Sequence, residues 1–180
     1  MDPNQWSTVD LANYRFSCNG QQKYTGHEML QQGTYNALIG QTNYYDSTLI
    51  SFEDSHLAFK RSLGEGFAWE VLEVYSGPPN VTFTWRHFGK MTDYFCCPGL
   101  SGLSYKVDPT NKMVKIYGMC KATINDQFQI QDLQIFYDPN QLFTQLTEIS
   151  PFAPFARLNI RQPTSKQQTQ SDLQSTMDFK

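Results

Sequence analysis

The sequence predicts one α+β domain that is built on an antiparallel β-sheet. Three observations indicate this fold class: segments of alternating apolar and polar residues form two hairpins, helix signals lie near the ends of this region, and the strand–helix–strand rhythm of a parallel sheet is absent. A chain of 180 residues is long enough for one such core. We place the domain at residues 1–146 and expect an extended polar tail at residues 147–180, where proline and glutamine are frequent.

Helix and strand signals alternate in the first third of the chain. Thr25 followed by Glu28 is the pattern of a capping box, which predicts a short helix that ends at Gly33. Residues 48–52 and 57–63 are short apolar segments with flanking polar residues, and we expect a strand at each.

Two strand pairs and a final helix are expected in the rest of the domain. Residues 67–75 and 81–88 alternate on either side of a turn that contains glycine and two prolines. Residues 112–124 and 128–137 form a second pair, and residues 140–148 are expected to form a short helix.

The composition argues against several kinds of partner. The formal net charge of −3 provides no basic surface for nucleic acid or acidic lipid. No stretch approaches the roughly 20 apolar residues of a membrane helix, and the polar N-terminus lacks the apolar core of a signal peptide. We therefore expect a cytoplasmic protein with its four cysteines reduced. The histidines and cysteines do not have the spacing of metal ligands, so no metal or other cofactor is expected.

The first hairpin separates into two faces of different chemistry. Pairing Tyr75 with Val81 places Glu70 opposite Arg86, where the two would form a cross-strand ion pair, although a bulge near the loop would change this register. The first face would carry Trp69, Val71, Glu73, Tyr75, Val81, Phe83, Trp85 and His87. The second face would carry Glu70, Leu72, Val74, Thr82, Thr84 and Arg86, which suits packing against another sheet.

The aromatic face is the expected wall of a pocket. A buried carboxyl such as Glu73 would have a raised pKa, as a general acid or base requires, and His87 or Asp132 could share that role. Alternatively, Glu73 and His87 lie at the sheet ends and only contact solvent or backbone. The residues expected to contact a bound molecule are Trp69, Tyr75, Phe83, Trp85, Tyr117 and Tyr137.

Several stretches taken together resemble the plant pathogen-related proteins. They are Trp6–Asp10, Tyr14–Gly20, Gly66–Pro79, Trp85–Gly89 and Ile135–Asp138. This family is similar to SnoaL-like and nuclear-transport-factor-like proteins, which form a cone of curved antiparallel sheet, a cystatin-like roll, with helices over its mouth. The resemblance also implies a helix before the Trp6 motif, and the sequence begins at Met1 just short of that motif.

The resemblance leaves three functions open, because relatives with this fold differ in activity. The first is binding of a small apolar molecule, with no catalysis or only weak catalysis. The second is a structural or interaction subunit that uses the domain and its tail as binding surfaces. The third is a polyketide cyclase or isomerase that transfers a proton through a carboxylate. Relatives that dimerise through the sheet lead us to expect a homodimer or a partner chain.

Overall fold

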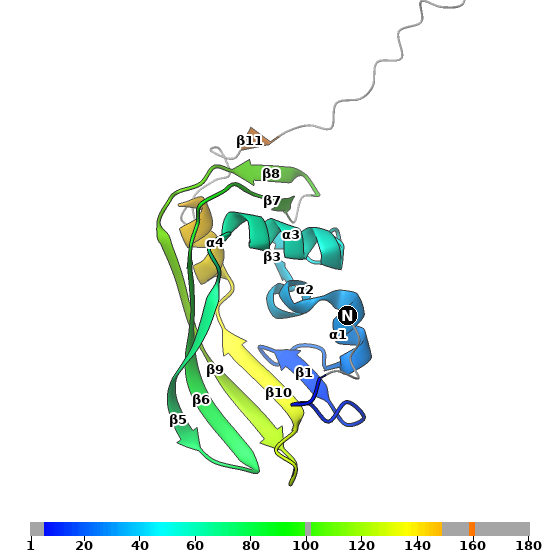
Figure 1. Ribbon diagram of the computed structural model, residues 1–180. Helices are drawn as coiled ribbons and strands as arrows, with labels where there is room; N and C mark the ends of the chain where they lie inside the picture. The colour runs from blue at the N-terminus through cyan, green and yellow to red at the C-terminus, as the bar shows by residue number, and fades with distance from the viewer. Residues whose placement is uncertain (1–5, 100–101, 149–158, 161–180) are drawn as a thin grey trace, which may run out of the picture.

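A strongly curved six-stranded sheet forms the frame of the molecule (Figure 1). The computed structural model describes residues 6–99 and 102–148 and the backbone of residues 159–160. The strands lie in the order β2-β1-β10-β9-β6-β5, and β1 runs parallel to β10 while the other neighbours are antiparallel. The bounds are β1 Arg15–Cys18, β2 Tyr24–Thr25, β5 Ala68–Ser76, β6 Asn80–Lys90, β9 Met113–Ile124 and β10 Ile130–Tyr137.

Helices cover the concave side of this sheet. Figure 1 shows α1, α2 and α3 stacked along that side, opposite β5, β6 and β9. The helices are α1 Gly26–Gln32, α2 Thr34–Ile39, α3 Phe52–Ser62 and α4 Asn140–Thr147. The smaller sheets comprise β3 Gln41–Thr42 with β4 Tyr45–Asp46, and β7 Phe95–Pro98 with β8 Ser104–Val107 and β11 Asn159–Ile160. The predicted α+β fold with a curved, mainly antiparallel sheet and helices over its mouth is confirmed.

The first predicted helix is present as α1. Thr25 accepts a hydrogen bond from the backbone N–H of Glu28, and the Glu28 carboxylate accepts one from the backbone N–H of Thr25. This capping box satisfies two backbone donors that the helix cannot pair internally. Gly33 ends the helix, as predicted, but the second helix α2 begins directly after it and was not predicted.

The prediction of two strands, at residues 48–52 and 57–63, is wrong. Residues 48–51 form a turn, and helix α3 extends from Phe52 to Ser62 with Leu63 as its C-cap. Ser51 caps the helix by accepting from the backbone N–H of Asp54. Acidic residues occupy the first turn and basic residues the last, which complements the helix dipole. Phe59 and Leu63, four residues apart, are both buried, so the apolar pattern of this segment has helical spacing.

The second strand pair and the last helix are confirmed as β9, β10 and α4. Most of the tail predicted at residues 147–180 lies outside the described residues. Within it, the backbone of Asn159–Ile160 forms β11 and pairs with Lys106 and Tyr105 of β8.

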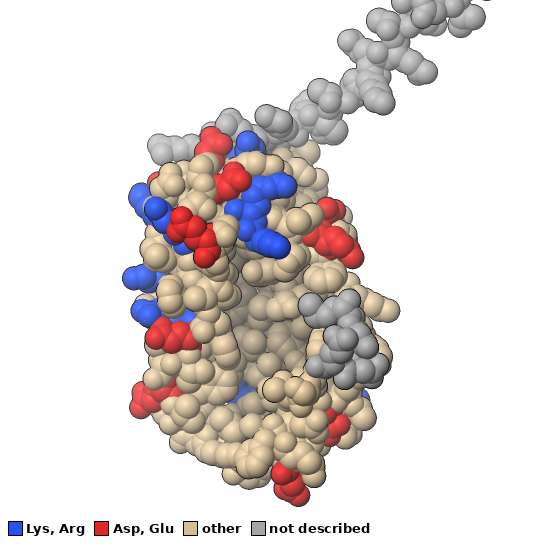
Figure 2. Space-filling view, viewed as in Figure 1, with Lys and Arg blue, Asp and Glu red and all other residues tan. Residues whose placement is uncertain are grey.

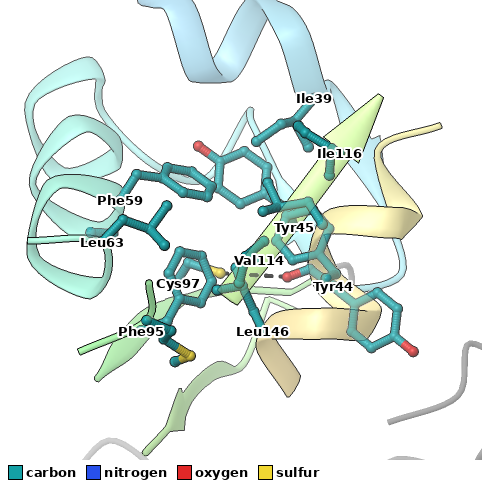
Figure 3. Packing of buried hydrophobic residues seen from close by; sticks show 14 of the residues in the cluster. Ile39, Tyr44, Tyr45, Phe59, Leu63, Phe95, Cys97, Val114, Ile116 and Leu146 are labelled. Carbon is teal, nitrogen blue, oxygen red and sulfur yellow. Dashed lines mark hydrogen bonds between the residues drawn. The ribbon is translucent and has the colours of Figure 1, made fainter. Parts of the chain in front are cut away.

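Aromatic side chains fill the core at the end of the sheet where α3, α4 and β7 meet (Figure 3). Tyr45, Phe59 and Phe95 are fully buried and contact one another or Phe143 ring to ring. The Tyr45 hydroxyl also lies within hydrogen-bonding distance of Asn36 Oδ1 and of Ser55 Oγ, at 2.6 Å from the latter. This end of the molecule is therefore solidly packed.

Candidate functional site

An apolar pocket lies next to this core on the concave face, between the sheet and helices α1 and α2. The space-filling view shows the molecule hollowed between these layers, with few charged side chains around the opening (Figure 2). The cavity volume is about 360 Å³. Its walls are Trp6, Tyr14, Phe16, Met29, Thr34, Tyr35, Leu38, Ile39, Phe67, Trp69, Trp85, His87, Ile116, Leu133, Ile135, Tyr137 and Leu142.

Trp85 forms the floor of this pocket because a glycine lies opposite it. Trp85 pairs with Gly118 across β6 and β9, and its indole ring occupies the space that a side chain at position 118 would fill. Its ring also contacts that of Tyr137, with centroids 5.7 Å apart. The Tyr137 hydroxyl donates to the carbonyl of Leu38, which ties the sheet to α2. Two of the predicted contact residues therefore lie in the pocket wall and are held in place.

A β-bulge in β5 changes the faces of the first hairpin. Trp69 pairs with His87 and Glu70 pairs with Arg86, but an irregularity after Val71 brings Glu73 opposite Thr84. Because paired residues share a face, Glu73 lies on the outer, convex face and not in the pocket. Its placement among the aromatic residues was wrong, since one extra residue reverses the alternation. Outside, Arg86 donates to the Glu70 carboxylate through Nε at 3.0 Å and Nη2 at 2.5 Å.

The two predicted contact residues Tyr75 and Tyr117 also lie away from the pocket. Tyr117 pairs with Arg86, so it is on the outer face, and 48% of its surface is exposed. Tyr75 stands at a second irregularity of β5 and donates to Glu73 at 3.0 Å. Strand alternation assigned Tyr75 to the pocket face, and that alternation does not hold across the irregularities of β5. Phe83 remains on the concave side, where its ring meets Trp69 edge to face at 5.8 Å.

Asp132 also faces outward. On β10, Leu133, Ile135 and Tyr137 line the pocket, so Asp132 projects from the other side of the strand. There it forms an ion pair with Lys23 at 2.6 Å and accepts a hydrogen bond from Gln134. Of the three residues proposed for proton transfer, His87 is the one that lines the pocket.

His87 is held firmly in the pocket wall. Its ring stacks on Phe67 with centroids 3.5 Å apart and an interplanar angle of 21°. Nδ1 lies 3.0 Å from the carbonyl oxygen of Ala68. Burial disfavours the charged ring and lowers the pKa of His87 from 6.5 to about 4. The imidazole is therefore neutral near pH 7.

Sequence reasoning missed the part of the wall that the N-terminal third supplies. Tyr14 and Phe16 alternate with Arg15 and Ser17, and this period of two could have identified β1 as a pocket strand. Tyr35, Leu38 and Ile39 have helical spacing on α2, but a six-residue helix gives too short a pattern to detect. Burial raises the pKa of Tyr14 to about 12, with a smaller contribution from the Asp132 charge.

The described residues contain no group of three His, Cys, Asp or Glu side chains that could hold a metal ion. Cys96 is exposed, while Cys18, Cys97 and Cys120 are buried as free thiols. Burial raises the pKa of these three thiols, to about 11 for Cys18 and about 12 for the other two. No helix in the described part of the chain has the length and apolar character of a membrane span.

Comparison with known proteins supports the resemblance in the sequence. No family model matches the chain. A pathogen-related protein of Hordeum vulgare is 30% identical over 143 residues, which cover 76% of this chain. The chain spans 57% of the length of that relative.

Solved structures with a similar arrangement share little sequence. A protein proposed to be a SnoaL-like polyketide cyclase, from Jannaschia sp., is 19% identical with a TM-score of 0.42, covering 79% of this chain and 76% of the other. An NTF2-like protein from Burkholderia thailandensis is 12% identical with a TM-score of 0.40, covering 81% and 84%. Likeness at this level carries nothing about substrate or activity. The chain therefore resembles the plant pathogen-related proteins over 76% of its length, and its described residues have a curved α+β fold.

Proposed function

We propose that the protein binds a small apolar molecule in the pocket between the sheet and helices α1 and α2. The observation that carries this proposal is the cavity of about 360 Å³ with its aromatic and aliphatic walls. Ligand sites in proteins have volumes of roughly 300–1,000 Å³ and are lined mainly by such side chains. The cavity lies at the small end of this range, which favours a compact molecule of one or two rings.

The chemistry of the wall supports an uncharged ligand. Among the described residues that line the pocket there is no Lys, Arg, Asp or Glu. A charged ligand would lose its hydration there without an opposite charge to replace it, which is strongly unfavourable. An apolar molecule instead gains about 25 cal/mol for each Å² of surface that it removes from water. Trp69, Trp85 and Tyr137 are the predicted contacts that we retain for it, and Phe83 contacts Trp69 edge to face.

Proton transfer by a carboxylate is the less favoured alternative. Glu73 and Asp132, the carboxylates suggested for that role, lie on the outer face of the sheet. His87 is the remaining candidate, and its ring is a weak base because burial lowers its pKa to about 4. We therefore favour a binding protein with no catalysis or only weak catalysis.

The test is to identify what the purified protein carries. Native mass spectrometry of the full chain, followed by solvent extraction, should show one small apolar compound per chain. Leu133→Trp fills the cavity from β10 and should abolish this occupancy, while Gln134→Trp is the matched control on the outer face of the same strand. The proposal fails if the wild-type protein is empty and no apolar compound raises its melting temperature.

A second candidate function, association with another chain, rests on the outer face of the sheet. Tyr117, Met119 and Phe136 lie near one another there, with 48%, 41% and 39% of their surfaces exposed. Exposed apolar patches of this kind mark interaction surfaces. A homodimer through this face would give twice the chain mass in light scattering, and Met119→Glu should return it to one. A monomer at all concentrations would argue against it.

The expected cytoplasmic location stays a prediction that cell fractionation would test.

A further inference from the structure

The surface of the pocket is mostly apolar, and two of its polar groups are unavailable to a bound molecule. The hydroxyl of Tyr137 donates to the Leu38 carbonyl. The indole N–H of Trp85 is buried from solvent and makes no hydrogen bond within the described part of the chain. It lies near the Cys120 thiol and partly opposes the rise of that thiol's pKa. The imidazole of His87 is different, because one of its two nitrogens is accessible.

The hydrogen bond to Ala68 fixes the tautomer of this imidazole. A backbone carbonyl can only accept, so Nδ1 must carry the proton and donate to it across 3.0 Å. The ring is neutral, so Nε2 has no proton and presents a lone pair. Nε2 makes no hydrogen bond to the part of the chain that the structure describes. It is also not one of the buried side-chain atoms without a partner in that part, so it is accessible. Stacking on Phe67 holds the ring plane, so this acceptor is oriented before any ligand arrives.

We propose that His87 Nε2 accepts a hydrogen bond from a hydroxyl or N–H group of the bound molecule. The ligand is then a neutral, planar, apolar compound with one such donor at the end that contacts His87. This inference rests on the proposed function and adds the polarity of the ligand. An ether or carbonyl oxygen at the same place would meet a lone pair, and a carboxylate would in addition find no cation in the described wall.

Three naphthalenes that differ only in the substituent at position 2 test the inference with the full-length protein at pH 7. We expect titration calorimetry to show that 2-naphthol binds about 3- to 10-fold more tightly than 2-methoxynaphthalene, the ratio that one net hydrogen bond supplies. Binding of 2-naphthoate should be weaker than that of both. Equal binding of 2-naphthol and its methyl ether would overturn the inference and leave the proposed function intact. Absence of binding by all three would overturn both.

Variants separate the hydrogen bond from the larger size of the ether. His87→Phe keeps a flat ring but no acceptor, so it should bring the ratio of the two affinities near one. Tyr117→Phe is the matched control on the outer face and should keep the wild-type ratio. His87→Gln retains an acceptor oxygen and serves if the phenylalanine variant does not fold, with part of the preference for 2-naphthol expected to remain. A ratio in either His87 variant equal to that of the wild type would overturn the inference.

Discussion

Replacing Gly118 by alanine should destabilise the protein and deform the pocket at the same time. A Cβ atom at this position would lie 2.3 Å from Cζ2 and 2.7 Å from Cε2 of Trp85, and 2.6 Å from the carbonyl oxygen of Phe136. All three distances are far below van der Waals contact. The indole would have to rise from the strand into the cavity, and the backbone of β10 would have to move.

The size of the effect follows from these contacts. Overpacking a core costs about 1–3 kcal/mol, and the upper end applies because one of the clashing atoms belongs to the backbone. Alanine in a strand recovers about 0.5–1 kcal/mol relative to glycine. The net loss is therefore about 2 kcal/mol in the free energy of unfolding. For a chain of this size it corresponds to a fall of roughly 4–8 °C in the melting temperature.

Calorimetry of Gly118→Ala beside Gly77→Ala measures this loss against a matched control. Gly77 lies in the hairpin turn, and a Cβ atom added there would have no neighbouring atom within 4 Å, so its substitution should leave the melting temperature nearly unchanged. Adding Trp85→Phe to Gly118→Ala should recover part of the stability, since the smaller ring relieves the side-chain clash. Equal melting temperatures for the two glycine variants would refute the reasoning.

Three further predictions follow from single groups. Tyr45→Phe leaves buried polar atoms of Asn36 and Ser55 without a partner and should lower the free energy of unfolding in urea by about 1–3 kcal/mol. Cys96 should be the cysteine that a thiol reagent modifies in the folded protein, with the other three reacting after unfolding; modification of more than one native thiol would contradict this. The pKa of folded His87 is about 4, below its ordinary 6.5, so the unfolded state binds the proton first as the pH falls. Wild-type stability should therefore decline relative to His87→Gln between pH 6.5 and 4, and parallel melting curves would contradict the burial of this ring.

The strand pairs could be predicted because each one carries its own signal. Alternation on both sides of a turn identifies β5 with β6, and a second run identifies β9 with β10. The helix α1 was predictable from the Thr25 and Glu28 cap. Helix α3 was not recognised because residues 57–63 are a short segment with apolar side chains at both ends. Such a pattern fits a strand and two turns of helix equally well.

The pocket depended on tertiary information that no local pattern contains. The bulge after Val71 moves Glu73 to the outer face, and nothing in the alternation of the neighbouring residues indicates where an extra residue is absorbed. Trp85 and His87 were correctly assigned to the pocket because they pair with the part of β5 that precedes this irregularity, where the alternation still holds. The walls from β1 and α2 come from segments far away in the sequence, and only the folded chain brings them together.

The central claim is that a small apolar molecule binds in the pocket. Methyl NMR of isoleucine-labelled protein tests this claim most directly. Addition of 2-naphthol should shift the methyl signals of Ile39, Ile116 and Ile135, which line the pocket, in a saturable way. The signals of Ile50 and Ile124, which lie outside it, should stay in place. Shifts confined to Ile50 and Ile124, or no saturable shift at any isoleucine, would contradict the account.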